Sequence, residues 1–319
     1  MTAPWEGLPS ALALWVTARS PFLARGGLRV WSSVSQILGR EREFREHWLA
    51  ARVARDLQYR VPVVVRLGNG MRIKVHVHDY VGGAIIRDGF YEPEMVRLVR
   101  RLLRTGETFF DVGAHVGQYS LLASELVGSS GAVHSFEPDP QTFRWLTSNI
   151  RRNGLANVRA NELALSSRRE VLQFYLSAVQ DIGSNSLQRP QQFSGNVVSV
   201  TCVSLDEYLE SARVPRINLL KMDVEGAEGA VLAGATRLLA REDRPLLIIE
   251  FEEARQQAFG SSCSRLAQSL AEWRYTLFRI TDLALEPYVS RNPDAPSFNV
   301  LAVPVHRVSE VAGLLGAAA

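Results

Sequence analysis

The chain has 319 residues, of which 46% are hydrophobic and 22% are charged, a composition typical of a soluble globular protein. Its 36 basic and 33 acidic residues leave a net charge of +3, too small a surplus to indicate a nucleic-acid partner. Cys202 and Cys263 have no spacing typical of a disulfide framework or a metal site, which favours a reducing, cytoplasmic location.

Residues 1–58 are predicted to form a helical accessory segment, because apolar residues recur at helical spacing among arginines and glutamates. The most apolar stretch is interrupted by Arg19 and Pro21, so neither a signal peptide nor stable membrane insertion is expected. Residues 59–106 lead into the main domain. They contain two extended runs around Gly68-Asn69-Gly70, typical of a β-hairpin, and a predicted helix over residues 92–103.

Apolar strands and amphipathic helices alternate in the main domain, residues 107–306. We predict helices over residues 117–127, 140–153 and 225–240, and seven strands, over residues 108–112, 132–136, 157–163, 217–222, 246–251, 275–280 and 298–303. This alternation predicts right-handed crossovers and an α/β fold with a doubly wound, mainly parallel, Rossmann-like sheet buried on both faces. Residues 307–319 are a C-terminal tail.

The connection from residue 164 to residue 217 is longer than a crossover helix needs. It holds two extended runs, residues 171–176 and 197–203, around a polar loop over residues 181–196. Long loops beside the carboxyl ends of parallel strands shape ligand sites in open α/β sheets. We therefore expect this insertion to contribute to substrate choice.

The most informative pattern is DVGAHVG, residues 111–117, where the first core strand runs into a helix. Such a turn lets backbone approach a ligand, and Glu137, at the end of the next strand, is placed to accept hydrogen bonds from both hydroxyls of an adenosine ribose. A dinucleotide loop needs glycine where His115 and Gln118 stand, which disfavours NAD. S-adenosylmethionine has no pyrophosphate and suits this turn better.

Four further segments accompany the turn: GFYEPE at residues 89–94, ALS at 164–166, VSLDEY at 203–208 and LLKMDVEGAE at 219–228. In this order they resemble the FkbM family of S-adenosylmethionine-dependent methyltransferases over about residues 80–255. The resemblance implies a class I methyltransferase fold, ending in an antiparallel strand pair, and O-methylation of a hydroxyl on a sugar, polyketide or other small molecule. His115 departs from the pattern, where asparagine is more usual.

The predicted cofactor site combines this resemblance with position along the chain. Asp111 is expected to hold the amino group of S-adenosylmethionine, Glu137 its ribose, and the residues after the third strand its adenine. The predicted cofactor-binding residues are Glu92, Asp111, Gly113, Ala114, His115, Gly117, Ser120, Glu137, Pro138, Ala164, Leu165 and Asp223.

Asp223 and Glu225 are the candidate general bases or acceptor-positioning groups, with His115 as a weaker third candidate. Glu225 and Glu228 are expected on the first turn of one helix, where acids are also favoured for structural reasons alone. Asp223, Glu250 and Glu252 follow or end neighbouring strands, but no spacing identifies a metal site, and none is predicted.

Three functions stay open at this point. The first is an S-adenosylmethionine-dependent O-methyltransferase with a small-molecule or carbohydrate acceptor. The second is an NAD-dependent oxidoreductase, and the third is a catalytically silent protein that binds S-adenosylmethionine as a scaffold. The sequence leaves the acceptor, the choice between oxygen and nitrogen, the help of a divalent cation and the oligomeric state undetermined.

Overall fold

The computed structural model describes residues 62–76, 79–176, 185–189, 193, 195–281, 284–289 and 297–315. The predicted helical segment over residues 1–58 lies outside these ranges. The described residues fall into two compact units that divide between Tyr91 and Glu92. Within the described ranges, no helix is both long and apolar enough to cross a membrane.

The first unit contains the predicted β-hairpin. Strand β1 (Pro62–Arg66) pairs antiparallel with β2 (Arg72–His76) around a turn in which Gly70 has a φ of 87°. This positive φ explains the glycine, since other residues adopt it at a cost. Helix α5 (Tyr80–Asp88) follows, capped by Asp79, and was not among the predicted elements.

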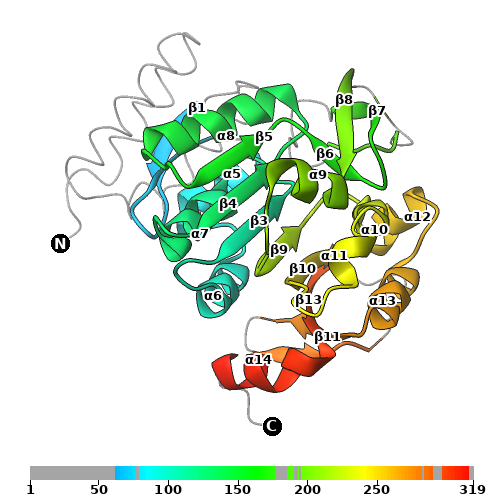
Figure 1. Ribbon diagram of the computed structural model, residues 1–319. Coiled ribbons are helices and arrows are strands. Elements are labelled where there is room, and N and C mark those ends of the chain that lie inside the picture. The colour runs from blue at the N-terminus through cyan, green and yellow to red at the C-terminus, as the bar shows by residue number, and fades with distance from the viewer. Residues whose placement is uncertain are drawn as a thin grey trace, which may run out of the picture. The chain divides into compact units, whose positions relative to one another are not determined.

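The second unit is built on one large sheet, drawn in Figure 1. Its order is β12-β11-β13-β10-β9-β3-β4-β5. The five parallel strands are β3 (Thr108–Val112), β4 (Ala132–Phe136), β5 (Val158–Asn161), β9 (Leu219–Met222) and β10 (Leu246–Phe251). The antiparallel strands are β11 (Tyr275–Ile280), β12 (Leu285–Pro287) and β13 (Phe298–Pro304).

The doubly wound, mainly parallel architecture is confirmed, but the sheet has eight strands where we predicted seven. The additional strand is β12, which pairs with β11 at the edge of the sheet. Its three residues are too few to show the alternation that marks a strand in a sequence. Thr281 closes the connection by bonding to the carbonyl oxygen of Ala284.

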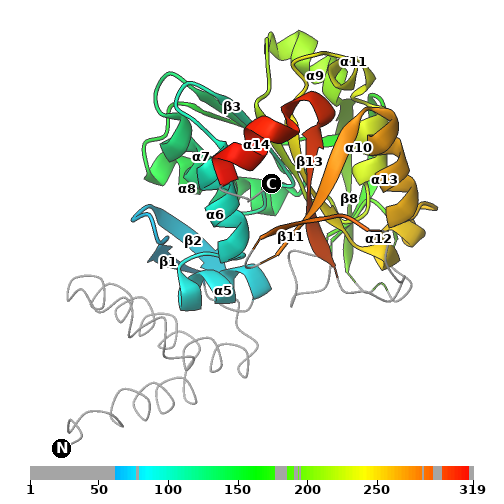
Figure 2. The same ribbon diagram turned by 90° about the horizontal axis from the view of Figure 1, so that it is seen from below.

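Helices cover both faces of the sheet, as Figure 2 shows. On one side lie α6 (Pro93–Leu102), α7 (Gln118–Val127) and α14 (Val308–Leu315), and on the other α9 (Leu205–Ala212), α10 (Glu228–Ala233), α11 (Thr236–Leu239) and α13 (Cys263–Glu272). Helices α8 (Pro140–Arg152) and α12 (Glu253–Ala258) and the short 3-10 helix η2 (Val305–Arg307) complete the unit. The second group packs on the main apolar core, which includes Phe110, Met222 and Ile249.

The predicted helix over residues 225–240 was wrong. The structure has a loop to residue 227, then α10, a break at Gly234, and α11. Glu225 and Gly226 have φ values of 59° and 101°, which no α-helix contains. The backbone at this break lies directly against the carbonyl oxygen of Ser166. A side chain at Gly234 would collide with that oxygen.

The long connection forms a small sheet of its own, with order β6-β8-β7. The two predicted extended runs are present as β7 (Glu170–Leu176) and β8 (Asn196–Ser204), and β6 (Ala164–Ser166) lies beside β8. Helix α9 follows β8 directly and was not predicted; the Ser204 hydroxyl caps it by accepting from the N–H of Glu207. Half of the polar loop over residues 181–196 lies outside the described residues.

Candidate active site

A row of polar side chains crosses the middle of the large sheet. Register places Ser135, Asp111 and Lys221 beside one another on β4, β3 and β9. The residues that alternate with them, such as Phe110 and Met222, belong to the apolar core on the opposite face. Because successive side chains on a strand point to opposite faces, this row points toward the side that carries α6 and α7.

A second row lies one step nearer the carboxyl ends of the parallel strands. Asp223 follows the last residue of β9, and Glu250 near the end of β10 is paired with Asn299 of β13. Since Met222 pairs with Ile249, Asp223 and Glu250 are the next neighbours along these two parallel strands. Both rows therefore meet at the edge where open α/β sheets bind ligands.

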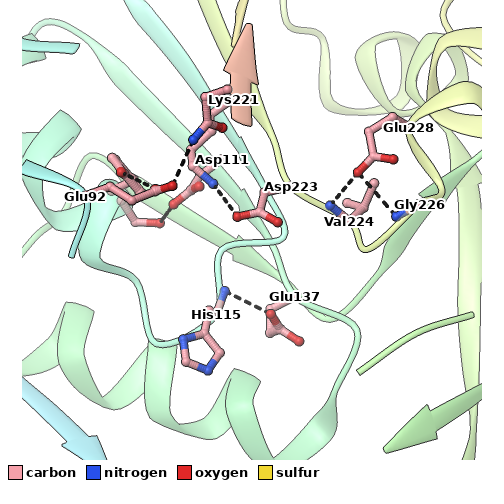
Figure 3. A network of polar contacts seen from close by, with 12 residues as sticks. Glu92, Asp111, His115, Glu137, Lys221, Asp223, Val224, Gly226 and Glu228 are labelled. Atoms are coloured by element: carbon pink, nitrogen blue, oxygen red, sulfur yellow. Dashed lines mark hydrogen bonds and ion pairs between the residues drawn. The ribbon is translucent and has the colours of Figure 1, made fainter. Parts of the chain in front are cut away.

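A buried lysine is the centre of this network. Lys221 is only 3% exposed, and its Nζ lies 3.1 Å from Oδ2 of Asp223 and 4.8 Å from the ring centroid of Tyr119. The Tyr119 hydroxyl donates to Oε2 of Glu92 over 2.9 Å, and the amide of Asn299 donates to Oε1 over 2.8 Å. Figure 3 shows Lys221 between Glu92 and Asp223. The network thus joins the start of α6 to α7, β9 and β13.

Lys221 and Asp223 keep each other ionised. Burial disfavours the ammonium form of Lys221, but Asp223, Glu92 and Asp111 outweigh that effect and raise its pKa. Burial also opposes ionisation of Asp223, yet the charge of Lys221 and a hydrogen bond with Glu250 lower its pKa below the ordinary value. The Asp223 side chain is 32% exposed. An ionised carboxylate is therefore accessible at the end of β9.

Glu137 closes the turn between β3 and α7. The backbone N–H of His115 donates to Oε2 of Glu137 over 2.9 Å, and the N–H of Asp139 donates to Oε1 over 2.9 Å. His115 has a φ of 49°, in the left-handed region that favours glycine. Glu137 is 6% exposed, and burial raises its pKa to about 8. Each carboxylate oxygen has two acceptor sites, so two sites are left after these bonds.

The two glycines of the turn have packing reasons as well as conformational ones. Gly113 and Gly117 have φ values of 80° and 95°. A side chain at Gly113 would collide with the carbonyl oxygen of Asp223, and one at Gly117 would meet the side chain of Leu146 on α8. The glycines therefore let the turn lie directly against the end of β9, which brings His115 close enough to influence the pKa of Asp223.

Glu228 holds the loop that follows β9. This side chain is 1% exposed; its Oε1 accepts from the N–H of Val224 over 3.1 Å, and its Oε2 accepts from Nε2 of Gln256 over 2.6 Å. Glu225 points elsewhere and pairs with Arg255 over 2.8 Å. Our expectation that Glu225 and Glu228 share one helical turn and one direction was therefore wrong, because the helix begins only at Glu228.

Replacing Glu228 by alanine should lower the free energy of unfolding by about 2–4 kcal/mol, because buried donors of the loop and of Gln256 would lose their acceptor. Urea unfolding measures this. The control is Glu207→Ala, which removes a carboxylate with a 38% exposed side chain that pairs with Arg169, and should cost less than about 1 kcal/mol. Equal effects of the two substitutions would show that Glu228 does not hold the loop.

Residues 111–277 match the methyltransferase FkbM domain, and they contain the turn, Glu137, the Lys221–Asp223 pair and the Glu228 loop. The chain belongs to the FkbM methyltransferase family. The family consists of S-adenosylmethionine-dependent enzymes, so the resemblance drawn from the motifs is confirmed, as is the class I methyltransferase fold that it implied.

Individual relatives have low sequence identity to this chain. The chain is 31% identical over 154 residues to the hexuronic acid methyltransferase AglP of Haloferax volcanii, covering 48% of this chain and 60% of AglP. It is 30% identical over 199 residues to the 31-O-demethyl-FK506 methyltransferase FkbM of Streptomyces tacrolimicus, covering 53% of this chain and 74% of that enzyme. The crystal structure of methyltransferase FkbM from Methylobacillus flagellatus KT is 16% identical, with a TM-score of 0.41 over 70% of this chain and 52% of that one. The match to AglP spans less than two thirds of its length.

Several predicted cofactor residues of this FkbM-family chain have partners within the protein. Asp111 lies inside β3 and is 1% exposed; its Oδ2 accepts from the Ser120 hydroxyl over 2.6 Å, and Ser120 in turn lies 2.7 Å from the Ser135 hydroxyl. The single hydroxyl hydrogen of Ser120 is therefore used by Asp111. Oδ1 of Asp111 is buried and has no hydrogen-bond partner among the described residues.

Other predicted residues belong to strands and turns that surround the nucleotide turn. Ala164 and Leu165 lie on β6 and are 6% and 2% exposed. Ala164 packs with buried residues of β7 and β8, and Leu165 packs into the main apolar core. Ala114 is buried in the turn, and its N–H donates to the carbonyl of Phe136 over 2.9 Å. Pro138 follows Glu137 and is half-buried. Their contact with a cofactor stays a prediction.

Glu92, a predicted cofactor-binding residue, contacts α7 and β13 through its carboxylate. It precedes α6 with a φ of 51° and makes no capping bond. Its carboxylate accepts from Tyr119 and Asn299 instead. The sequence analysis identified neither partner and gave Lys221 no role. Lys221 is nevertheless one of only two lysines in the chain and lies within the LLKMDVEGAE segment at residues 219–228.

The acids once considered as metal ligands are partly brought together. Asp223 and Glu250 are hydrogen-bonded neighbours, but the Lys221 ammonium lies on Asp223, and Glu252 pairs with Arg255 at 3.5 Å. Among the residues that the structure describes, no group of three or more acidic, histidine or cysteine side chains has the arrangement of a metal site.

Part of the long insertion contacts the loops at this edge. The Asn185 amide donates to Oδ2 of Asp139 over 3.3 Å, and the Ser186 hydroxyl donates to the carbonyl of Glu225 over 3.4 Å. Ser186 is also bridged to Tyr175 of β7. Asn185 and Ser186 therefore connect the loop that follows β4 with the loop that follows β9.

Proposed function

We propose that the chain is an S-adenosylmethionine-dependent O-methyltransferase whose acceptor is a hydroxyl on a sugar or other small molecule. The observation that carries this proposal is the partly exposed, ionised carboxylate of Asp223 beside the Glu137 turn. The relatives named above, a hexuronic acid methyltransferase and a 31-O-demethyl-FK506 methyltransferase, support an oxygen acceptor.

The residues of the turn fit the donor by their hydrogen-bonding capacity. Glu137 keeps one acceptor site on each oxygen after bonding two backbone N–H groups, which suits two adjacent ribose hydroxyls. Oδ1 of Asp111 is a buried acceptor, and the charged neighbours of this carboxyl group include Lys221 and Asp223. The ammonium group of S-adenosylmethionine suits such an oxygen as a hydrogen-bond partner, directly or through water.

S-adenosylmethionine supplies an electrophilic methyl group when bound. In the transfer the hydroxyl would exchange its proton for that methyl group, and the donor would leave as S-adenosylhomocysteine. Asp223 is the group that we assign to accept a hydrogen bond from the hydroxyl and to take the proton. Its lowered pKa keeps it ionised at neutral pH but limits its strength as a base, so orientation of the hydroxyl is the larger share of its role.

S-adenosylhomocysteine should bind more tightly as the pH rises from about 6 to 8 and then level off. In the free protein the pKa of Glu137 is raised to about 8, so the carboxyl is protonated below that pH, whereas two ribose hydroxyls favour the ionised form. Binding below pH 8 should therefore release a proton. Calorimetry at neutral pH in two buffers of different ionisation enthalpy detects that release, and equal heats in both buffers would contradict the assignment.

The function itself is tested by incubation with methyl-labelled S-adenosylmethionine and a panel of acceptors that includes hexuronic acids, neutral sugars and macrolide alcohols. Transfer of label to an alkali-stable ether is the expected result. Label on nitrogen would replace the oxygen assignment. Tight binding of S-adenosylhomocysteine without transfer to any acceptor would favour a silent scaffold, and displacement of that ligand by NAD would favour an oxidoreductase.

A further inference from the structure

Two carboxyl side chains are hydrogen-bonded to each other at the carboxyl ends of β9 and β10. Asp223 follows β9, and Glu250 is the last residue but one of β10. Parallel pairing of Met222 with Ile249 brings the two positions side by side, and their side chains make a mutual hydrogen bond. A hydrogen bond between two carboxyl groups needs a proton on one of them, since a carboxylate ion has no hydrogen to donate.

The surroundings decide which of the two keeps that proton. Asp223 has the ammonium of Lys221 at 3.1 Å, which stabilises its negative charge. In the described part of the chain Glu250 forms no ion pair, and the acids Asp223, Glu225 and Glu228, from the loop after β9 and from α10, are among the charged groups that influence it. Burial and these acids raise the pKa of Glu250 well above its usual range.

Arg255 of α12 is a basic residue close to these acids, and its ion pairs are with Glu225 and Glu252, not with Glu250. It lies 2.8 Å from Glu225 and 3.5 Å from Glu252. Asn299 is paired with Glu250 across β10 and β13, and its side-chain amide donates a hydrogen bond to Glu92. The described elements around Glu250 therefore favour its neutral form, while those around Asp223 favour the anion.

We propose that Glu250 is a positioning residue of the methyl-transfer site, a neutral carboxylic acid that donates its proton to the Asp223 carboxylate. Together with the Lys221 ammonium, this bond fixes Asp223 from two sides and leaves its remaining acceptor sites for the acceptor hydroxyl. This role rests on the proposed function, in which Asp223 orients that hydroxyl. Glu250 keeps its proton through the reaction, and no bond to it forms or breaks.

A pair that holds one proton has a consequence at high pH. When Glu250 loses its proton, two adjacent anions repel each other, and the Asp223 carboxylate loses its orientation. The kcat should therefore fall on the alkaline side of neutrality. A glutamine at position 250 keeps an N–H donor in the same place and cannot ionise, so it should keep most of the activity and abolish the alkaline fall.

The test compares Glu250→Gln, Glu250→Ala and the control Glu252→Gln, each by the pH dependence of kcat and of KM. We expect Glu250→Gln and Glu252→Gln to retain kcat within about threefold at neutral pH, and Glu250→Ala to lose at least about tenfold, which is about 1.4 kcal/mol. The alkaline fall should persist in Glu252→Gln and be absent from Glu250→Gln. A Glu250→Gln variant as inactive as Glu250→Ala would overturn the proposal, because it would require an ionised Glu250.

Infrared spectroscopy separates this inference from the proposed function. At neutral pH the difference spectrum between wild type and Glu250→Gln should contain the carbonyl band of a protonated carboxylic acid, whether or not an acceptor has been found. Absence of that band contradicts the shared proton. A band without methyl transfer to any acceptor leaves the pair in place and counts against the O-methyltransferase assignment alone.

Discussion

Asp223→Asn is expected to lower kcat by about 100-fold, while the affinity for S-adenosylhomocysteine changes much less. Asparagine has nearly the same shape but cannot take the hydroxyl proton, and it turns one acceptor oxygen into a donor. The expected loss is at the lower end for general bases because Lys221 lowers the pKa of Asp223 and so weakens it as a base. Initial rates under saturating donor, with calorimetry for binding, measure both quantities.

The matched control is Asp243→Asn. Asp243 precedes β10 at the opposite end of the sheet and pairs with Arg241 over 2.8 Å, with a side chain that is 40% exposed. This change should leave kcat within about twofold, since surface ion pairs contribute little. If Asp223→Asn were equally harmless, Asp223 would not be the group that receives the acceptor hydroxyl.

Lys221→Met is expected to lower the free energy of unfolding by about 3–5 kcal/mol at neutral pH, because it leaves buried acids without their counter-charge. Glu92, Asp111 and Asp223 all act on the charge of Lys221, which is only 3% exposed. Methionine has a similar volume, so the loss comes mainly from the charge and not from a cavity. Chemical denaturation at several pH values measures it.

Lys74→Met is the control, because Lys74 is the other lysine of the chain and lies on β2 in the first unit. It should cost less than about 1 kcal/mol. A second variant, Glu92→Gln, should recover part of the stability when added to Lys221→Met, since it removes one of the uncompensated acids. A Lys221→Met protein as stable as wild type would contradict the network.

The strands of the large sheet could be predicted closely because each is a short apolar run bounded by polar residues or turns. β3, β4, β10 and β11 have the predicted bounds, and the burial of β3, β4 and β10 on both faces produces the continuous apolar runs that mark parallel sheets. Helix α9 was missed because it begins immediately after β8, without a loop to separate the two patterns.

The loop after β9 shows where local patterns mislead. Residues 225–240 have the composition of one helix, but long-range contacts impose a different path: Glu228 accepts from Val224, Glu225 pairs with Arg255, and Gly234 lies against Ser166. The local propensity for a helix is weak compared with such tertiary contacts. The acids in this loop were therefore assigned a shared helical face that they do not have.

The candidate site was predictable as a set of strand ends but not as a network. The rule that ligands bind at the carboxyl ends of parallel strands pointed to Asp111, Glu137 and Asp223. It gave no sign that Asn299, 207 residues from Glu92, would bind that carboxylate, or that Tyr119 would lie beneath Lys221. Such partners depend on strand order and crossover helices, which bring together residues without any common sequence pattern.

The central claim is that this edge of the sheet binds S-adenosylmethionine through Glu137, and calorimetry with S-adenosylhomocysteine tests it most directly. Wild type and the control Glu272→Gln, an exposed acid at the end of α13, should bind alike, whereas Glu137→Gln should bind about 100-fold more weakly, the loss of roughly two hydrogen bonds to a charged acceptor. Thermal unfolding of Glu137→Gln checks that the variant is folded. Unchanged affinity in a folded Glu137→Gln protein, or no binding by wild type, would contradict the account.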